Sequence, residues 1–266
     1  VRASYDNPLE SFNINVLGTV NLLDALRNQD TMKSFICITT DKVYENNDQN
    51  VSFKETDNLG GSDPYSASKA CSELVVNSYR NSFYKNLYVS LSTVRAGNVI
   101  GGGDWSKDRL IPDFVKAWQT DSEFVIRNPN SIRPWQHVLE PLNAYVELAE
   151  KTWGKSALEG SYNIGPDSRD EISVQKVIEL GCSDLDGWNR ISFQTSFDQK
   201  KEAETLRLNS EKAKQLFGYM PLFNVATAIQ LTINWYREYY SGTDALSLCE
   251  NDIENFSTLK GKLRND

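Results

Sequence analysis

The sequence predicts an α/β fold in which helices cover a parallel sheet. Apolar residues recur at intervals of three and four over residues 7–28 and 64–84, which is the spacing of one helix face. Residues 34–39 and 87–94 are instead short apolar runs, typical of buried strands. Helix, strand, helix and strand follow one another with short connections, and this order favours parallel strands joined by helices.

The individual elements follow from local signals. Pro8 stands where the first helix, 7–28, begins, and Asp63-Pro64 opens the second, which runs to about residue 84. The polar segment 41–62 contains Gly60-Gly61 and is expected to be a loop. After the glycines at 101–103, we expect strands at 123–127 and 161–164, helices at 111–119, 139–153, 173–180, 210–217 and 223–240, and a loose helical tail at 244–266.

Composition restricts the class of protein. The chain has 266 residues, 39% of them apolar, enough for one large or two modest domains. Its net charge of −8 argues against a nucleic-acid partner. Four widely spaced cysteines and a single histidine predict no metal site. No apolar run is long enough to span a membrane, so we expect a cytoplasmic protein with no membrane partner.

Two short strings suggest a catalytic site. Thr39-Thr40-Asp41-Lys42-Val43-Tyr44 follows the first strand, and Tyr65-Ser66-Ala67-Ser68-Lys69 lies in the first turn of the second helix. A phenol that acts as a base must lose its proton, and an ammonium one helical turn away stabilises the phenolate. Ligands of open parallel sheets bind at the carboxyl ends of the strands. The strings therefore indicate a site that oxidises an alcohol with a bound nicotinamide.

Further segments carry a family resemblance. Residues 15–23, 39–44, 65–69 and 95–100 together resemble the extended short-chain dehydrogenase/reductases that act on nucleotide sugars. Within that superfamily, Thr40-Asp41-Lys42-Val43-Tyr44 resembles the sugar-nucleotide 4,6-dehydratases. Segments 96–105, 108–112, 126–129 and 133–141 are similar to the CDP-glucose 4,6-dehydratases in particular. The resemblance covers nearly the whole chain up to the C-terminal tail.

The resemblance implies a Rossmann-like doubly wound parallel sheet lacking its first strands, with a smaller α/β substrate domain. Residues 1–98 and 135–165 would be the remainder of the NAD-binding domain, and 99–134 and 166–266 the nucleotide-sugar-binding domain. The chain begins with Val1 rather than methionine, and no Gly-rich dinucleotide turn occurs in it. We therefore expect an N-terminally truncated chain that is itself inactive and binds NAD poorly, while its parent chain is active.

The activity that the resemblance implies is conversion of CDP-glucose to CDP-4-keto-6-deoxyglucose by internal hydride transfer through NAD. Tyr65, supported by Lys69, would take the proton of the 4-hydroxyl, and Thr40 would contact the 4-oxygen. Asp41 would be the acid at the departing 6-hydroxyl, with a pKa raised by burial, and Lys42 the base at C5, with a pKa lowered by burial. On a regular strand Asp41 and Lys42 would point to opposite faces, so the backbone must turn there.

The resemblance also implies ligand contacts. The expected cofactor contacts are Asn15, Thr39, Tyr65, Lys69 and Arg95. The expected substrate contacts are Asn98, Arg109, Leu110, Arg127 and Arg133. The single histidine, His137, is expected to pack behind Trp135 rather than to act in catalysis. Lys201-Glu202-Ala203 departs from the His-Glu-Ala that is common in the family.

Two alternative functions remain open on the sequence. One is another nucleotide-sugar 4,6-dehydratase or a 4-epimerase, and the other is a non-enzymatic, NAD-sensing binding protein. The leading hypothesis places the enzyme in deoxysugar biosynthesis for lipopolysaccharide O-antigen. The full-length form is expected to be a homodimer or homotetramer, with the helices at 8–28 and 64–84 paired across a two-fold axis.

Overall fold

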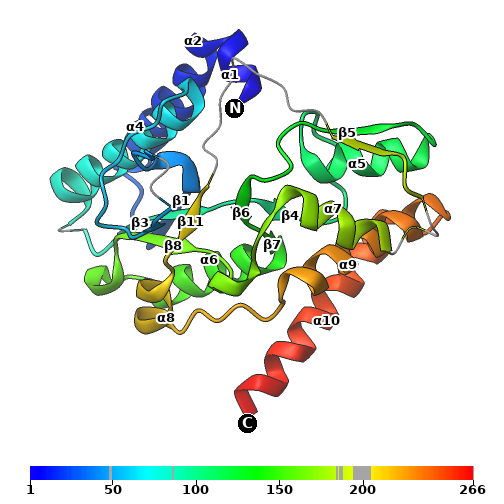
Figure 1. The fold of residues 1–266 in the computed structure, drawn as a ribbon. Coiled ribbons are helices and arrows are strands. Elements are labelled where there is room, and N and C mark those ends of the chain that lie inside the picture. Colours follow the sequence, from blue (N-terminus) through cyan, green and yellow to red (C-terminus); the bar gives the residue numbers. More distant parts are fainter. Residues whose placement is uncertain (48–49, 86, 184, 186–187, 194–204, 266) are drawn as a thin grey trace. The chain divides into compact units, whose positions relative to one another are not determined.

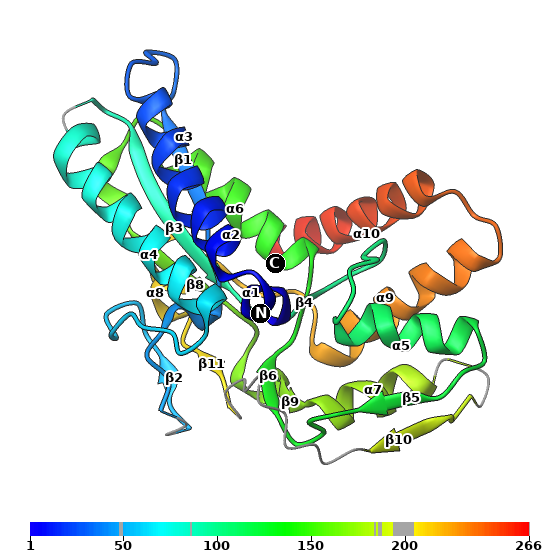
Figure 2. The same cartoon turned by 90° about the horizontal axis from the view of Figure 1, so that it is seen from above.

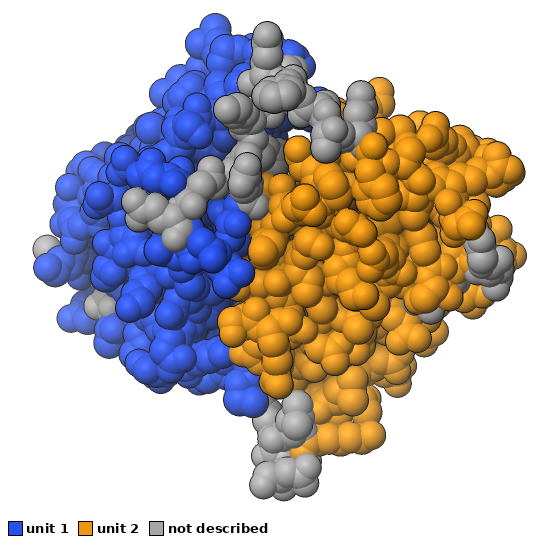
Figure 3. All heavy atoms as spheres, in the orientation of Figure 1, with its two compact units in different colours: residues 1–97, 142–165, 200–220 blue, residues 98–141, 166–199, 221–266 orange. Residues whose placement is uncertain are grey.

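The computed structural model describes residues 1–47, 50–85, 87–183, 185, 188–193 and 205–265. The chain divides into two compact units (Figure 3). Unit 1 comprises residues 1–97, 142–165 and 200–220, and unit 2 comprises residues 98–141, 166–199 and 221–266.

The sheet of unit 1 has three parallel strands in the order β1-β3-β8 (Figure 1). They are β1 (Ser34–Ile38), β3 (Ser90–Ala96) and β8 (Ser161–Ile164). In the register, Ile38 is opposite Val94, and Arg95 is opposite Asn163. The predicted strands and their parallel arrangement are therefore confirmed, with the strand expected at 87–94 lying at 90–96.

Two long helical segments of unit 1 run side by side (Figures 1 and 2). The first joins α2 (Pro8–Phe12), the π-helical turn η1 (Asn13–Leu17) and α3 (Gly18–Leu26), and the second joins α4 (Pro64–Tyr79) to a second π-helical turn, η3 (Arg80–Tyr84). Both begin with a side-chain cap, because Asn7 accepts from the amide of Glu10 and Asp63 from the amide of Ser66. A short helix, α1 (Arg2–Asp6), precedes them.

The opposite side of the sheet is covered by α6 (Leu139–Lys151) and α8 (Glu211–Phe217), with the 3-10 turn η4 (Ser156–Leu158) before β8. Their apolar side chains share one core with β3 and β8, made of Val94, Ala144, Leu148, Tyr162, Ile164, Ala213, Phe217 and Tyr219. The 3-10 turn η2 (Asp41–Val43) follows β1, and a small parallel pair joins β2 (Ser52–Phe53) to β11 (Arg207–Leu208).

Unit 2 contains three two-stranded sheets among its described residues. β4 (Val99–Ile100) pairs with β7 (Gln136–His137) and β5 (Phe124–Ile126) with β10 (Ile191–Phe193), both in parallel, whereas β6 (Ile132–Pro134) and β9 (Glu171–Ser173) are antiparallel. The helical elements are α5 (Leu110–Gln119), the 3-10 turn η5 (Ser168–Asp170), α7 (Val174–Ser183), α9 (Val225–Tyr240) and α10 (Ala245–Asn265).

The C-terminal tail differs from the expectation of a loose helix. Residues 245–265 form one 21-residue helix, α10. Leu248 is buried in the main core of unit 2, and the ring of buried Phe256 packs edge-on against Phe223 at 5.4 Å. Two apolar anchors two turns apart therefore hold a helix that is otherwise polar.

The boundaries of the units differ from the predicted domains at residue 98, which belongs to unit 2, and in two longer segments. Residues 135–141 belong to unit 2, because β7 pairs with β4. Residues 205–220, predicted to be in the second domain, belong to unit 1, because β11 pairs with β2. The assignment of NAD binding and nucleotide-sugar binding to the two parts stays a prediction.

Across the described ranges, no helix is both long and apolar enough to cross a membrane. The same residues contain no cluster of three histidine, cysteine or acidic side chains that could hold a metal ion.

Candidate functional site

The end of β1 is where the chain changes direction. The Thr39 amide donates to the carbonyl of Val94 at 2.9 Å. Thr40 has an extended backbone, and its hydroxyl caps the 3-10 turn η2 by accepting from the amide of Lys42 at 3.4 Å. A turn replaces the strand at Asp41, as the hypothesis of a shared pocket required. As a result the Lys42 ammonium lies 3.3 Å from Oδ1 of Asp41, on the same side of the backbone rather than the opposite one.

The Asp41 carboxyl is completely buried. Its Oδ1 accepts from the Thr40 hydroxyl at 3.0 Å and from the Lys42 ammonium at 3.3 Å. Its Oδ2 is also buried and has no hydrogen-bond partner among the described residues. A buried carboxyl oxygen without a partner is unusual in a folded protein, so Oδ2 is a candidate for contact with a ligand.

Tyr65 and Lys69 lie in the first two turns of α4, and both are half-buried. The Lys69 ammonium donates to the backbone carbonyl of Ile38, the last residue of β1, at 3.3 Å. The amide of Tyr65 is held by the hydroxyl of Ser4 at 3.1 Å. The fold therefore brings the predicted Tyr and Lys helix to the strand end that leads into the Thr-Asp-Lys turn.

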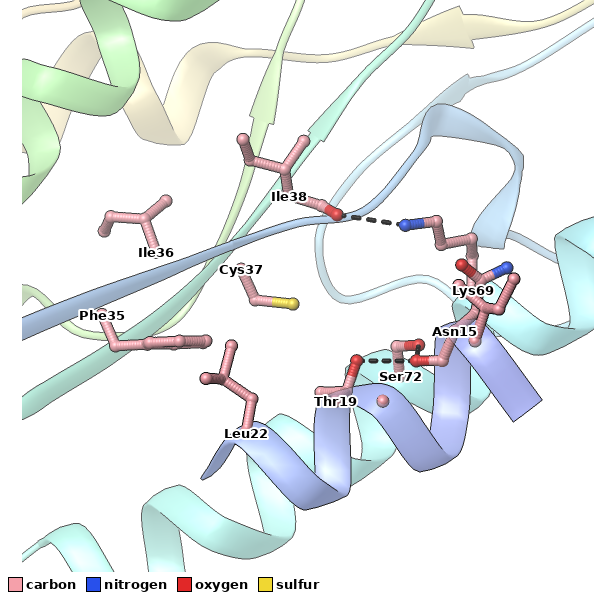
Figure 4. A pocket seen from close by; sticks show the side chains of 11 residues that line it. Asn15, Thr19, Leu22, Phe35, Ile36, Cys37, Ile38, Lys69 and Ser72 are labelled. Atoms are coloured by element: carbon pink, nitrogen blue, oxygen red, sulfur yellow. Dashed lines mark hydrogen bonds between the residues drawn. The ribbon is translucent and has the colours of Figure 1, made fainter. Parts of the chain in front are cut away.

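A cavity of about 340 Å³ lies beside β1 in unit 1 (Figure 4). Two of the predicted cofactor contacts, Asn15 and Lys69, line it, together with Ile14, Gly18, Thr19, Leu22, Phe35, Ile36, Cys37, Ile38 and Ser72. Asn15 is held from several sides, because its amide donates to the Ser68 hydroxyl at 2.9 Å and its backbone carbonyl accepts from Ser72 at 2.7 Å. The cavity thus combines an apolar strand face with an amide and an ammonium.

Two further predicted cofactor contacts, Thr39 and Arg95, belong to a buried network around Glu73. The Glu73 carboxylate accepts from Thr39 at 2.6 Å and from both Nε and Nη2 of Arg95 at 2.9 Å. Thr93 and Ser161 donate to it as well, at 2.6 and 3.1 Å. Burial alone would raise the pKa of Glu73, but the Arg95 guanidinium and the hydroxyls hold it below its usual range. The side chains of Thr39 and Arg95 therefore bind within the unit, and their contact with a cofactor stays a prediction.

Tyr44, which ends the Thr-Asp-Lys-Val-Tyr string, extends this network. Its hydroxyl accepts from Arg95 at 2.8 Å and donates to Oδ1 of Asn163 at 2.6 Å. Its ring stacks on Phe53 with centroids 4.8 Å apart, and burial raises the pKa of its phenol. Sequence reasoning missed the structural roles of Glu73 and Tyr44. The sequence did contain a signal for Glu73, because this glutamate comes four residues after Lys69 and therefore lies on the same face of the predicted helix.

The predicted substrate contacts all lie in unit 2. Arg109 and Arg127 are each beside an aspartate of the segment between β4 and α5, with Nη1 to Oδ2 of Asp104 at 3.7 Å and Nη2 to Oδ1 of Asp108 at 3.6 Å. Leu110 starts α5 and packs against the core of the unit. These pairs are long and partly exposed, so the guanidinium groups remain available to an anion.

The remaining two substrate candidates are more enclosed. Asn98 has a left-handed backbone, with φ of 43°, and its Oδ1 is buried with no hydrogen-bond partner in the described part of the chain. Arg133 is buried, and its Nη1 donates to the carbonyl of Ile132 at 2.9 Å. Contact of these five residues with a nucleotide sugar stays a prediction.

His137 packs against a different ring from the one expected. It lies edge-on to Phe223 at 5.6 Å, whereas the Trp135 indole donates to the carbonyl of Ile172 at 3.1 Å. Burial lowers the pKa of His137 to about 4. The Lys201-Glu202-Ala203 departure lies outside the described residues.

Comparison with known proteins agrees with this fold and these motifs. Residues 1–232 match the family described as GDP-mannose 4,6 dehydratase. The chain is 38% identical to the CDP-glucose 4,6-dehydratase of Salmonella typhimurium, over 96% of this chain and 73% of that one. It is 26% identical to the dTDP-glucose 4,6-dehydratase of Xanthomonas campestris, over 89% of this chain and 69% of that one.

Solved structures show the same fold at lower identity. The dTDP-glucose 4,6-dehydratase of Streptomyces venezuelae, solved with NAD and TYD bound, superposes with a TM-score of 0.77 at 24% identity, covering 90% of this chain and 70% of that chain. The UDP-glucuronic acid 4-epimerase of Bacillus cereus, solved with UDP-glucuronic acid and NAD, gives 0.73 at 18% identity, covering 85% and 68%. Unit 1 therefore has a Rossmann-type fold, and the chain belongs to the nucleotide-sugar 4,6-dehydratase family.

Proposed function

We propose that this protein is a CDP-glucose 4,6-dehydratase that uses NAD to make CDP-4-keto-6-deoxyglucose. The observation that carries the proposal is the turn after β1. There a buried carboxyl with one unpartnered oxygen, an ammonium and a hydroxyl follow directly on the strand whose last carbonyl binds Lys69. This is the acid, base and alcohol-binding set that dehydration needs in one place.

The residues of unit 1 fit a nicotinamide cofactor. Lys69 uses one of the three donors of its ammonium on Ile38, which leaves donors for a ligand, and Asn15 lines the same cavity. When bound, NAD supplies the acceptor for the hydride that leaves C4 of the sugar and that is later returned to C6. Thr39, Tyr65 and Arg95 are the other proposed cofactor contacts. The side chains of Thr39 and Arg95 bind Glu73, so their proposed role is to hold the ends of β1 and β3 in place beside the cofactor.

Tyr65 is the proposed base for the 4-hydroxyl. A tyrosine with an ordinary pKa near 10 is almost fully protonated at neutral pH, so it needs a cation close by to act as a base. Lys69 is one turn away on the same face of α4. Thr40 is the proposed hydrogen-bond partner of the 4-oxygen, and its hydroxyl is at present engaged with Asp41.

Asp41 and Lys42 are the proposed acid and base of the elimination. Lys42 removes the proton at C5, which the 4-ketone acidifies, and Asp41 gives a proton to the departing 6-hydroxyl, so that the C6–O bond breaks and water leaves. The proton lost from C5 is replaced there when hydrogen returns to C6, so the sugar loses one water and is neither oxidised nor reduced overall. The role of unit 2 in the proposal is to bind the nucleotide sugar through Asn98, Arg109, Leu110, Arg127 and Arg133.

Product analysis tests the proposal. The full-length protein is incubated with NAD and, separately, with CDP-glucose, dTDP-glucose or GDP-mannose, and the 4-keto-6-deoxy product is measured by its absorbance in alkali and by mass. We expect turnover with CDP-glucose to exceed turnover with the other two. If another of these nucleotide sugars is dehydrated faster, that nucleotide replaces CDP in the proposed substrate. If the product is a 4-epimer of the substrate, the protein is an epimerase. Tight NAD binding without any product would indicate an NAD-sensing protein.

We further propose a cytoplasmic homodimer or homotetramer that supplies a 6-deoxysugar precursor for lipopolysaccharide O-antigen. Large apolar side chains are exposed on the two neighbouring helical segments of unit 1, among them Leu9, Ile14, Leu17 and Leu74. Sedimentation of the wild type and of Leu74→Lys tests the pairing of these helices. A wild type that sediments as a monomer at micromolar concentration would exclude it.

A further inference from the structure

The geometry points to Gly97 as a positioning residue that leaves room for the carboxyl of Asp41. Gly97 follows the last residue of β3, and it is buried. A Cβ atom added to it would lie 1.8 Å from Oδ2, 2.2 Å from Cγ and 2.9 Å from Cβ of Asp41. The Asp41 carboxyl therefore occupies the space that any side chain at position 97 would need.

The space, and not the backbone, requires glycine at this position. Among the described glycines, six have a positive φ, and Gly97 is not one of them, so its φ lies outside the left-handed region that favours glycine. The contact differs in this respect from glycines such as Gly218, which has φ of 77° and nothing within 4 Å of an added Cβ. A substitution at Gly97 thus acts through the atoms that it meets.

The Asp41 carboxyl cannot move away cheaply. It is fully buried, and its Oδ1 is held by Thr40 and Lys42. A methyl group at position 97 would collide first with Oδ2 and would force the Asp41 carboxyl to move. Rotation of the Asp41 side chain would then break both hydrogen bonds of Oδ1. Gly97 therefore determines which oxygen of Asp41 stays unpartnered and where that oxygen lies.

This inference rests on the proposed role of Asp41 as the acid at C6. Because Gly97 acts through Asp41 and not on the sugar, its substitution should affect the elimination more than the preceding oxidation at C4. Displacement of a catalytic group by about 1 Å can cost roughly 100-fold in rate. We expect Gly97→Ala to lower dehydration by about that factor, while C4 oxidation changes by less than about threefold.

The experiment has two independent readouts, which are the kinetics of the two reaction steps in the full-length protein and folding stability. In single turnovers with CDP-glucose, reduced-nicotinamide absorbance reports C4 oxidation, and the alkali absorbance of the product reports dehydration. The matched control is Gly261→Ala, because Gly261 lies in α10 with open space around an added Cβ. An equal loss of both steps in Gly97→Ala, or no loss of either, would overturn the positioning role.

The second readout is folding stability in a double-mutant cycle, which needs no activity. Two of the three close contacts of an added Cβ are to carboxyl atoms, so they vanish in Asp41→Ala. Gly97→Ala should destabilise the wild type strongly and the Asp41→Ala background less than half as much. If Gly97→Ala does not fold, the double variant is expected to fold, and additive effects of the two substitutions would contradict the inference.

The two readouts separate this inference from the proposed function. A wild type that makes no dehydrated product from any nucleotide sugar overturns the proposed function and the catalytic part of the inference together. Coupling between positions 41 and 97 in stability would then still establish the packing relationship.

Discussion

Arg95 donates two hydrogen bonds to the carboxylate of Glu73, from Nε to Oε1 and from Nη2 to Oε2, each at 2.9 Å. The two side chains are only 3% and 2% exposed. The pair joins β3 to α4, and thus the centre of the sheet to the helix that carries Tyr65 and Lys69. The importance of such a buried pair lies mainly in the cost of breaking it, because removal of one partner leaves the other as a buried, unpaired charge.

Loss of one partner of this pair should therefore be costly. We expect Arg95→Met to lower the free energy of unfolding by about 3–5 kcal/mol, because the Glu73 carboxylate would stay buried without its guanidinium. Urea denaturation measures the change. The matched control is Arg27→Met, because Arg27 pairs with Asp24 on the surface and such pairs contribute about 0–1 kcal/mol. Equal effects of the two substitutions would show that the buried pair has no special role.

The Tyr236 hydroxyl binds both the backbone amide and the backbone carbonyl of Asp104, within unit 2. It donates to the carbonyl of Asp104 at 2.7 Å and accepts from the amide of Asp104 at 3.1 Å. We expect Tyr236→Phe to cost about 0.5–1.5 kcal/mol in stability, because two partly buried backbone groups lose their partner. Since Asp104 lies beside Arg109, the KM for the nucleotide sugar should rise more than kcat falls.

Tyr239→Phe is the control for this prediction. The Tyr239 ring packs in the same aromatic cluster, against Trp105 at 5.4 Å and Trp235 at 5.4 Å. Its substitution keeps those ring contacts and should change neither stability nor KM appreciably. If Tyr236→Phe behaves like Tyr239→Phe, the hydroxyl does not hold the segment.

Glu140 should make the protein less stable as pH rises. Burial raises its pKa from 4.5 to about 7, although the amides of Leu222 and Phe223 donate to Oε1 at 2.8 and 2.7 Å. Between pH 4.5 and 7 the folded protein keeps a proton that the unfolded chain has released, so stability falls through this window and is level above it. Glu140→Gln keeps the acceptor without the charge. Its advantage over the wild type should grow with pH to about 3 kcal/mol near pH 7.

His137 has the opposite sign and serves as the comparison. Its pKa is lowered by burial from 6.5 to about 4, so between these values the unfolded chain holds a proton that the folded protein lacks. Stability due to this group therefore rises with pH through the same range. Urea denaturation at several pH values from 4 to 8 should show His137→Phe losing the rise and Glu140→Gln losing the fall. Parallel pH curves for wild type and Glu140→Gln would exclude the raised pKa.

Tyr65→Phe tests the proposed base at O4. The phenol contributes through proton transfer, so its loss should lower C4 oxidation by about 100- to 10,000-fold. The rate is measured as reduced-nicotinamide absorbance with CDP-glucose. Tyr79→Phe is the control on the same helix, since Tyr79 is at the last turn of α4 and its ring packs on Phe83 at 5.1 Å. Oxidation by Tyr65→Phe at the wild-type rate would remove this tyrosine from the mechanism.

The sequence by itself determined the elements of this protein and the kind of chemistry they carry. Helical spacing over 8–26 and 64–84 and the apolar run at 34–38 depend on residues close together in the chain, so they can be recognised without the fold. The Thr-Asp-Lys-Val-Tyr and Tyr-x-x-x-Lys strings are also local, and together they resembled the family to which the chain proved to belong.

Only the tertiary structure decided which distant residues meet. The contact of Tyr44 with Asn163 and the close approach of Gly97 to Asp41 depend on the order and register of parallel strands. The place of Glu73 at the centre of the buried network and the pairing of β11 with β2 in unit 1 likewise depend on contacts between residues far apart in the chain. Local spacing cannot supply these relations, because side-chain periodicity says which face of an element is buried and not what that face will touch.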